Sequence, residues 1–270
     1  MIDPILTANP VILALLAGCG TWALTALGAS TVFLTHQEDR RLLDTMLGFA
    51  GGVMIAASFW SLLAPAVELS GGGRFPAWIH VGTGFLIGGI FLRVVDYLIP
   101  HLHIGFPTTM ADGPASGHSK STLLILAIAL HNIPEGLAMG IAFGAVAAGF
   151  PHATLAGAVA LALGIGVQNF PEGLAVSLPL RREGNSASKS FFCGQISGVV
   201  EPLSAFIGAA VVIGASSLLP YALAFAAGAM IFVVVEEVIP ESQIHGNTDL
   251  ATMGTLLGFV VMMALGIGLG

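Results

Sequence analysis

Charge is the first property that the sequence lacks. Asp, Glu, Lys and Arg make up only 9% of its 270 residues and hydrophobic residues make up 56%, whereas a soluble globular domain carries about 25% charged residues. Eight basic residues stand against fifteen acidic ones, which gives a formal net charge of −7. The basic residues are also scattered singly or in pairs. This composition argues against a soluble protein and excludes a basic nucleic-acid-binding surface.

Cysteine is equally scarce, and long polar stretches are missing. Cys19 and Cys193 lie in separate apolar segments without Cys-x-x-Cys spacing, so we predict neither a disulfide nor a cysteine-ligated metal site. We interpret both as small core residues. No stretch between the apolar segments is long enough to form a soluble domain, which argues against an additional soluble unit.

Apolar runs of about 20 residues are what the chain has instead, and this length crosses the hydrocarbon core of a bilayer. With a mean hydropathy of +0.93, the sequence predicts an all-α polytopic membrane protein with one transmembrane domain over residues 1–270. The first run lacks a preceding basic segment, so we interpret it as a helix and not as a signal peptide. The eight predicted helices are 11–34, 45–69, 77–99, 121–148, 153–180, 192–215, 219–240 and 250–269.

The basic residues between the predicted helices also indicate their orientation, because cytoplasmic loops are enriched in Lys and Arg. On the non-cytoplasmic side, the loops contribute only one basic residue, Arg74. Both termini are therefore expected outside, the loop 100–120 in the cytoplasm, and the protein in the plasma membrane (the inner membrane of a bacterium). The residues on the cytoplasmic side are Arg40, Arg41, Lys120, Arg181, Arg182 and Lys189.

One polar sequence motif occurs twice inside these apolar runs. Residues 131–138 read His-Asn-Ile-Pro-Glu-Gly-Leu-Ala, and residues 168–175 read Gln-Asn-Phe-Pro-Glu-Gly-Leu-Ala. Side chains three and four residues apart share one helix face, and a carboxylate within the bilayer indicates a functional site. A hydrogen-bonded network that only joins two helices is the structural alternative. We predict a divalent-metal site made of His131, Asn132, Glu135, Gln168, Asn169 and Glu172.

The chemical types of the candidate ligands indicate which metal the site would bind, and depth in the bilayer indicates which further residues would join it. Imidazole nitrogen with carboxylate and amide oxygens suits zinc and similar divalent ions better than Cu(I) or Ca²⁺. Glu201 and Met54 fall at a similar depth when each residue adds ~1.5 Å along a helix. Pro134 and Pro171 each remove a backbone donor, and we expect them to kink their helices and free carbonyl groups.

Several further residues are weaker candidates for a metal route. Glu236 and Glu237 are expected at the inner mouth, where they either relay a cation or are simply solvated. Asp44 is expected at the inner end of its helix, as a route residue or as an ordinary interface residue. The loop 100–120 contains His101, His103 and His118, but we favour a flexible connector because Gly, Pro and Ser dominate it.

The paired motif resembles the fourth and fifth helices of the ZIP (Zrt/Irt-like) metal transporters, close to the bacterial branch, and the resemblance covers nearly the whole chain. It implies that helices 1, 4, 5 and 6 move against helices 2, 3, 7 and 8, often within a homodimer. It also implies two metal sites and an exit route along Glu236 and Glu237. The first site would contain His131, Glu135, Gln168, Glu172 and Met54. The second would contain Asn132, Glu135, Asn169, Glu172 and Glu201.

We therefore expect a transporter that moves Zn²⁺ into the cytoplasm, with Cd²⁺, Fe²⁺ or Mn²⁺ as alternative cargo and no organic cofactor. An intramembrane metalloenzyme would need a motif such as His-Glu-x-x-His, and this chain has His-Asn-x-x-Glu. A metal sensor would need a soluble output domain. Asn169 departs from the two-metal pattern, because close bacterial relatives can have Asp there, so we expect one well-occupied site.

Overall fold

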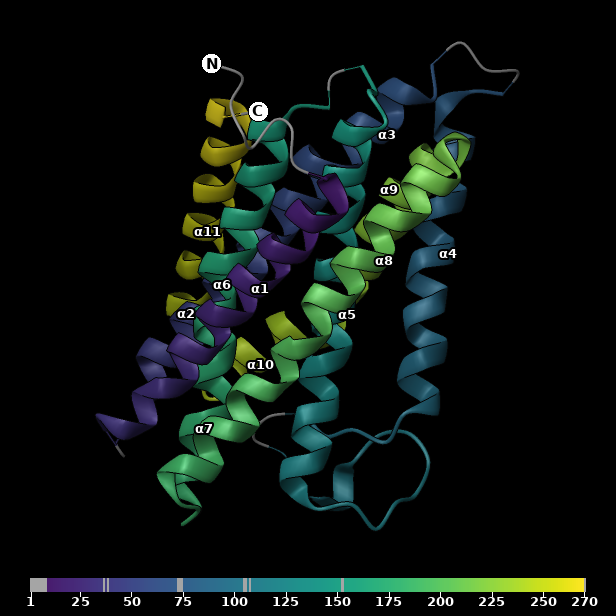
Figure 1. The fold of residues 1–270 in the computed structure, drawn as a ribbon. Helices are drawn as coiled ribbons and strands as arrows, with labels where there is room; N and C mark the ends of the chain where they lie inside the picture. Colours follow the sequence, from purple (N-terminus) through teal and green to yellow (C-terminus); the bar gives the residue numbers. More distant parts are fainter. Residues whose placement is uncertain are drawn as a thin grey trace.

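The computed structural model describes residues 9–35, 37, 39–71, 75–103, 106, 108–151 and 153–269. These residues are almost entirely helical, and the only β pairing among them is an isolated bridge between His101 and Asp112. Eight helical segments in the described part of the chain are long and apolar enough to cross a membrane. The predicted fold class, an all-α membrane protein with eight spanning helices, is confirmed (Figure 1). Arg74, used above for orientation, lies outside the described residues.

Four spans are single helices, and four contain a 3₁₀ or π-helical turn. The spans are α1 (Pro10–Ala29) with a 3₁₀ turn (Ser30–Phe33); α2 (Arg40–Ala56), a π-helical turn (Ala57–Leu63) and α3 (Ala64–Leu69); α4 (Ala77–Leu98); α5 (Lys120–Ala147); α6 (Leu155–Arg182); α7 (Ala187–Ile196), a 3₁₀ turn (Ser197–Val199) and α8 (Val200–Gly214); a 3₁₀ turn (Ser216–Leu218), α9 (Leu219–Val233), a π-helical turn (Val234–Val238) and α10 (Ile239–Gln243); and α11 (Thr248–Leu269). One further 3₁₀ turn, Thr108–Met110, lies in the loop between α4 and α5.

Side-chain caps explain where several helices begin. The Asn9 side chain accepts a hydrogen bond from the backbone N–H of Val11, and Pro10 occupies the first helical position, where its missing N–H has no cost. Ser119 and Thr154 cap α5 and α6 in the same way. Such caps satisfy N–H groups that the first helical turn leaves unpaired. They therefore set the start, and with it the depth, of the two helices that carry the repeated motif.

Irregular turns interrupt the helices of three spans. We expected Pro134 and Pro171 to kink their helices and free carbonyl groups, and α5 and α6 continue as helices through both residues. The irregular turns lie in spans 2, 6 and 7. π-helical turns within α-helices occur frequently at functional sites, and the turn Val234–Val238 contains both Glu236 and Glu237.

The helices pack closely in pairs through small residues. The most extensive contacts join α2 with α11, α5 with α8, α4 with α9, and α1 with α6. In the α5–α8 pair, a Cβ added at Gly140 would lie only 2.1 Å from the carbonyl oxygen of Ala205. In lipid no hydrophobic force drives helices together, so this close backbone contact takes its place. The pairing brings Glu201, at the start of α8, against the motif on α5.

Candidate metal centre

The repeated motif forms one buried polar cluster between α5, α6 and α8. All six motif residues are buried. The side-chain amide of Gln168 donates a hydrogen bond to Glu135, and that of Asn169 donates one to Glu201 over 2.8 Å. Glu135 also lies close enough to Glu172 and Glu201 to interact with them electrostatically. The predicted meeting of these three spans is therefore present in the structure.

Many oxygen atoms of this cluster have no hydrogen-bond donor. Both carboxylate oxygens of Glu172 and one each of Glu135 and Glu201 are buried without a hydrogen-bond partner among the described residues. The side-chain oxygens of Asn132 and Gln168 share this property. Buried polar groups in native proteins are nearly always paired, and buried charges are paired or bind metals. A set of convergent oxygen acceptors without donors suits a cation.

Thr21, on α1, is a part of this cluster that the sequence reasoning missed. Its hydroxyl lies against the Glu201 carboxylate in a short hydrogen bond and is also bonded to the carbonyl of Gly18. Thr21 thus joins the first span to the site. A threonine carries no charge and is a weak metal ligand, so ligand-based reasoning passes over it. The only available signal was a polar residue within an otherwise apolar span.

Replacing Thr21 by Val removes this donor at nearly constant volume. We expect the variant to lose about 0.5–1.5 kcal/mol of stability, the typical net contribution of one hydrogen bond, because Asn169 still donates to the same Glu201 oxygen. The measurement is the midpoint of unfolding when SDS is titrated into purified protein in mixed micelles. Thr21→Ser keeps a hydroxyl and should stay near wild type. Equal midpoints for Thr21→Val and wild type would contradict the assigned hydrogen bond.

His131 does not point to the motif carboxylates as its spacing suggested. Its Nε2 atom pairs with Glu237, which lies in the π-helical turn of span 7. The prediction that His131 and Glu135 bind together is therefore not what this conformation shows, although Glu172 lies within electrostatic range of His131. The helical spacing placed both residues on one face, but only packing against span 7 brings a competing carboxylate to the imidazole.

The acidic pair of span 7 is divided between two environments. The Glu237 side chain is only 4% exposed and contacts both His131 and His103, with 3.2 Å between its Oε2 and Nδ1 of His103. The Glu236 side chain is 47% exposed and lies 3.9 Å from Arg93. The sequence left two interpretations of this pair, a cation relay and simple solvation, and simple solvation is wrong for Glu237. Its burial and partners favour a relay position.

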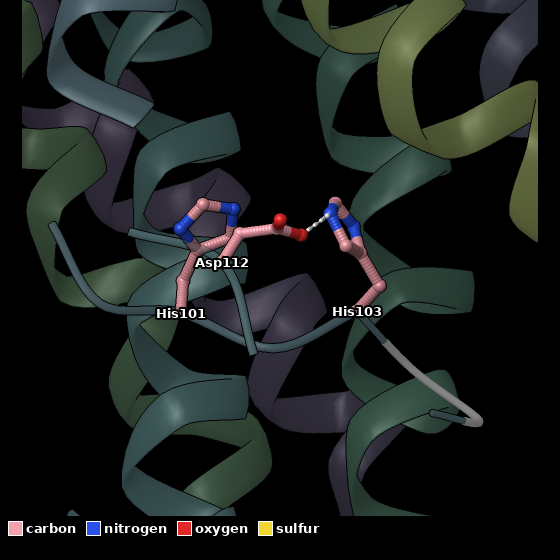
Figure 2. A group of neighbouring side chains, drawn as sticks. All are labelled: His101, His103 and Asp112. Carbon is pink, nitrogen blue, oxygen red and sulfur yellow. Dashed lines mark ion pairs between the residues drawn. The ribbon is translucent and has the colours of Figure 1, made fainter. Parts of the chain in front are cut away.

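Two groups of side chains near the loop 100–120 also have metal-ligating geometry. One consists of His101, His103 and Asp112 and the other of Asp96, His101 and Glu237, and the ligand atoms within each group lie within 4.8 Å of one another. Figure 2 shows the first group, in which Nε2 of His103 lies 3.1 Å from Asp112. Asp96 pairs with His101 at 2.9 Å and was missed by the sequence reasoning, although a carboxylate near the end of a span was the signal for it.

This arrangement corrects our interpretation of the loop 100–120 as a flexible connector. His101 and Leu102 are fully buried, and the backbone N–H of Leu102 bonds to the carbonyl of Leu123 in α5. The segment around His101 is thus docked onto the bundle. His118 is exposed and belongs to neither ligand group among the described residues. Composition alone did not predict this buried part of the loop.

Two other candidates, Met54 and Asp44, have different surroundings. Met54 is buried in the main apolar core, which also contains Leu161 and Ile165 of α6. Asp44 is fully buried and accepts a hydrogen bond from Asn247 over 2.8 Å, with His245 at 3.3 Å. Asp44 is therefore no ordinary interface residue. It joins α2 to the segment before α11.

The environment of His103 indicates how docking of the loop depends on pH. Its hydrogen bond with Glu237, together with the negative charges of Glu237, Asp112 and Glu241, outweighs burial and raises the pKa of His103 from 6.5 to about 9. A group whose pKa is raised in the folded state stabilises that state fully below its unfolded pKa. The contribution is lost as pH rises through about 9. At neutral pH His103 is therefore charged and holds the loop in place.

We expect the docked loop to open as pH rises from neutral to about 10. A cysteine at the buried position Leu102 should report this through its rate of thiol labelling, with Cys19 and Cys193 replaced by Ala. The matched control carries His103→Gln as well, which removes the charge and cancels the pH dependence of the thiol itself. The ratio of control to Leu102→Cys rates should fall toward one above pH 9. A ratio independent of pH would contradict charge-dependent docking.

Eight apolar helices around buried carboxylates, with a second acidic and imidazole cluster toward one end, define a membrane protein of the cation-transporting class. Comparison with known proteins identifies the family. A family model described as ZIP zinc transporter matches residues 114–266. The chain belongs to the ZIP zinc transporter family. It is thus an integral membrane protein of a transporter family and not an enzyme, so the metalloenzyme alternative is wrong.

Relatives match over almost the full chain. The protein named zinc transporter ZIP11 from Bos taurus is 44% identical, over 97% of this chain and 98% of the relative. Zinc transporter GufA from Myxococcus xanthus is 40% identical over 96% and 98%. Zinc transporter ZIPB from Bordetella bronchiseptica is 38% identical over 95% and 81%. Similarity therefore extends to animal members and is not confined to the bacterial branch.

Proposed function

We propose that this protein carries Zn²⁺ across the plasma membrane into the cytoplasm, through a site formed by Glu135, Gln168 and Glu172 near the middle of the bilayer. The observation that carries the proposal is the set of buried oxygen atoms without hydrogen-bond donors, which includes both oxygens of Glu172. A divalent cation balances the negative charge of these carboxylates. Relatives covering the whole chain are named zinc transporters, which supports zinc as the cargo.

Side chains on both sides of this site support a continuous route. A cavity of about 190 Å³ is lined by residues that include Glu68, Thr154 and Leu161. Leu161 lies two helical turns before Gln168, or ~10 Å along α6. On the other side, His131 contacts Glu237, and Glu237 contacts His103. We infer that the cation enters through the cavity and leaves along His131, Glu237 and the docked loop.

The packing of the helices supports an elevator-like movement. The pairs α1–α6 and α5–α8 belong to the spans that the family resemblance assigns to the moving group, and the pairs α2–α11 and α4–α9 to the other group. The tightest contacts thus fall within groups. The contact of Glu237 with His131 crosses between them, so it would have to break and reform when the groups slide.

Proteoliposomes test the proposed cargo directly. Purified protein should take up radioactive zinc down its gradient, and uptake should weaken when Cd²⁺, Fe²⁺ or Mn²⁺ is added outside if these ions share the site. Liposomes without protein give the background. Uptake no faster than this background, from protein shown to be folded, would refute the proposal.

The number of bound ions tests the role of Asn169. Its amide donates to one oxygen of Glu201 over 2.8 Å, so that oxygen already has a neutral partner, and Asn169 adds no negative charge for a second Zn²⁺. We expect about one zinc per chain in the wild type and more in Asn169→Asp, because added negative charge attracts a cation strongly at low dielectric. Elemental analysis of purified protein gives the ratio. Two zinc ions per wild-type chain would refute the single-site expectation.

A further inference from the structure

A second hollow opens at the side of the bundle, and its lining residues are separate from those of the proposed cation route. It has a volume of about 300 Å³ and is formed by α4, α5, α8 and α9; α4, α8 and α9 lie together on the right of Figure 1. Its floor includes the buried residues Ile141 and Gly208, and its rim includes the more exposed side chains of Ile87, Val211 and Tyr221. The Tyr221 hydroxyl is the only polar side-chain group among its lining residues.

The hollow lies at the depth of lipid tails. Ile87 is ten residues beyond Ala77, where α4 begins, and therefore ~15 Å along the helix. At the start of α4, Trp78 is largely exposed, as expected for an aromatic side chain at the membrane–water interface. The hollow thus extends from near the interface toward the bilayer centre. Hydrocarbon chains are the solvent at this depth.

Hydrogen-bonding groups stand at the interfacial end of the hollow. The ring of His80 packs edge-on against Tyr221, with 5.6 Å between centroids. Nδ1 of His80 is buried and has no hydrogen-bond partner among the described residues. His80 precedes Gly84, another lining residue, by one helical turn. The ring of Tyr221, with the imidazole of His80 packed against it, therefore stands at the end at which a lipid carries its ester and phosphate oxygens.

We propose that this hollow binds one acyl chain of a membrane phospholipid, with the ester region of the lipid beside Tyr221 and His80. Its size favours this occupant over a helix of another protein copy, because a helix with side chains is about 10–12 Å across. The chain fills the space between the pair α4–α9 and the pair α5–α8, which carries His131 and Glu201. The site stands whether or not zinc is the cargo.

A photoreactive phospholipid tests the site without measuring transport. Purified protein is reconstituted with a phosphatidylethanolamine that carries a diazirine in the middle of one acyl chain, and labelled residues are identified by mass spectrometry. We expect severalfold more labelling at the lining residues Ile87 and Val211 than at Leu86 and Ile90, which are exposed on α4 outside the hollow. Unlabelled lipid should compete at the hollow at concentrations that leave the other positions unchanged.

Two variants separate a specific site from general lipid contact. Ala222→Phe places a ring within the hollow and should reduce labelling there to the level of Leu86 and Ile90. Leu86→Phe adds a ring to the exposed face of α4 and should leave labelling of the hollow unchanged. Uniform, non-competable labelling of all exposed positions in wild-type protein would overturn the proposal. Cross-links between two copies of the chain at the hollow would overturn it in favour of a protein interface.

Discussion

Replacing Glu172 by Gln should reduce zinc uptake to the background of liposomes without protein. Both Glu172 oxygens are buried without hydrogen-bond donors among the described residues, so the carboxylate has no hydrogen bond to lose. The substitution keeps the shape of the side chain and removes the negative charge that a divalent ion needs. An unpaired charge is costly to bury, so the metal-free variant should be at least as stable as the wild type. Loss of transport without loss of stability distinguishes a cargo ligand from a structural residue.

A matched substitution at the membrane surface controls for this result. Glu183→Gln removes a carboxylate that is 41% exposed and pairs with Lys120, and exposed ion pairs contribute little to stability. Its uptake should equal that of the wild type. Radioactive zinc uptake and thermal unfolding are measured on all three proteins. Wild-type uptake by Glu172→Gln would remove Glu172 from the site, and a large fall in its stability would favour the structural network considered above.

Replacing Gly140 by Ala should disrupt the close contact between α5 and α8 that positions the site. The new methyl group would lie 2.1 Å from the carbonyl oxygen of Ala205 and 2.9 Å from its Cα. These are backbone atoms, so α8 itself has to move, and α8 carries Glu201. Overpacking by a single methylene already costs about 1–3 kcal/mol. We expect a lower unfolding temperature in detergent together with reduced zinc uptake.

Gly82→Ala is the control for this second substitution. A Cβ at Gly82 meets no atom within 4 Å, and Ala favours a helix over Gly by about 1 kcal/mol. The variant should unfold at or above the wild-type temperature and transport normally. If Gly140→Ala unfolded at the wild-type temperature, the backbone contact between α5 and α8 would be looser than described.

The repeated motif was readable in the sequence because it depends on local rules. Helical periodicity places residues three and four apart on one face, and the bilayer requires apolar runs of a set length. These two constraints predicted eight spans and gathered Glu135, Gln168 and Glu172 at one depth. The cost of burying a carboxylate in lipid marked them as functional. None of these inferences needs knowledge of which helix packs against which.

The partners of individual side chains depended on packing between distant segments. His131 and Glu237 are more than 100 residues apart, and nothing in either local pattern indicates that they pair. The docking of His101 likewise contradicts a loop composition that favours flexibility, because burial of Leu102 against α5 outweighs that tendency. Thr21 meets Glu201 only because α1 packs against α6 and α8.

By itself, then, the sequence determined the class of protein, its number of spans and the chemistry of the central donors. The tertiary structure decided which carboxylate faces which imidazole and how the loop 100–120 packs against the bundle. The physical reason is that periodicity and hydropathy act over a few helical turns, whereas pairing of buried polar groups is settled by which helices approach closely. Here that approach follows small residues such as Gly140, whose contact with Ala205 becomes apparent only when both helices are placed.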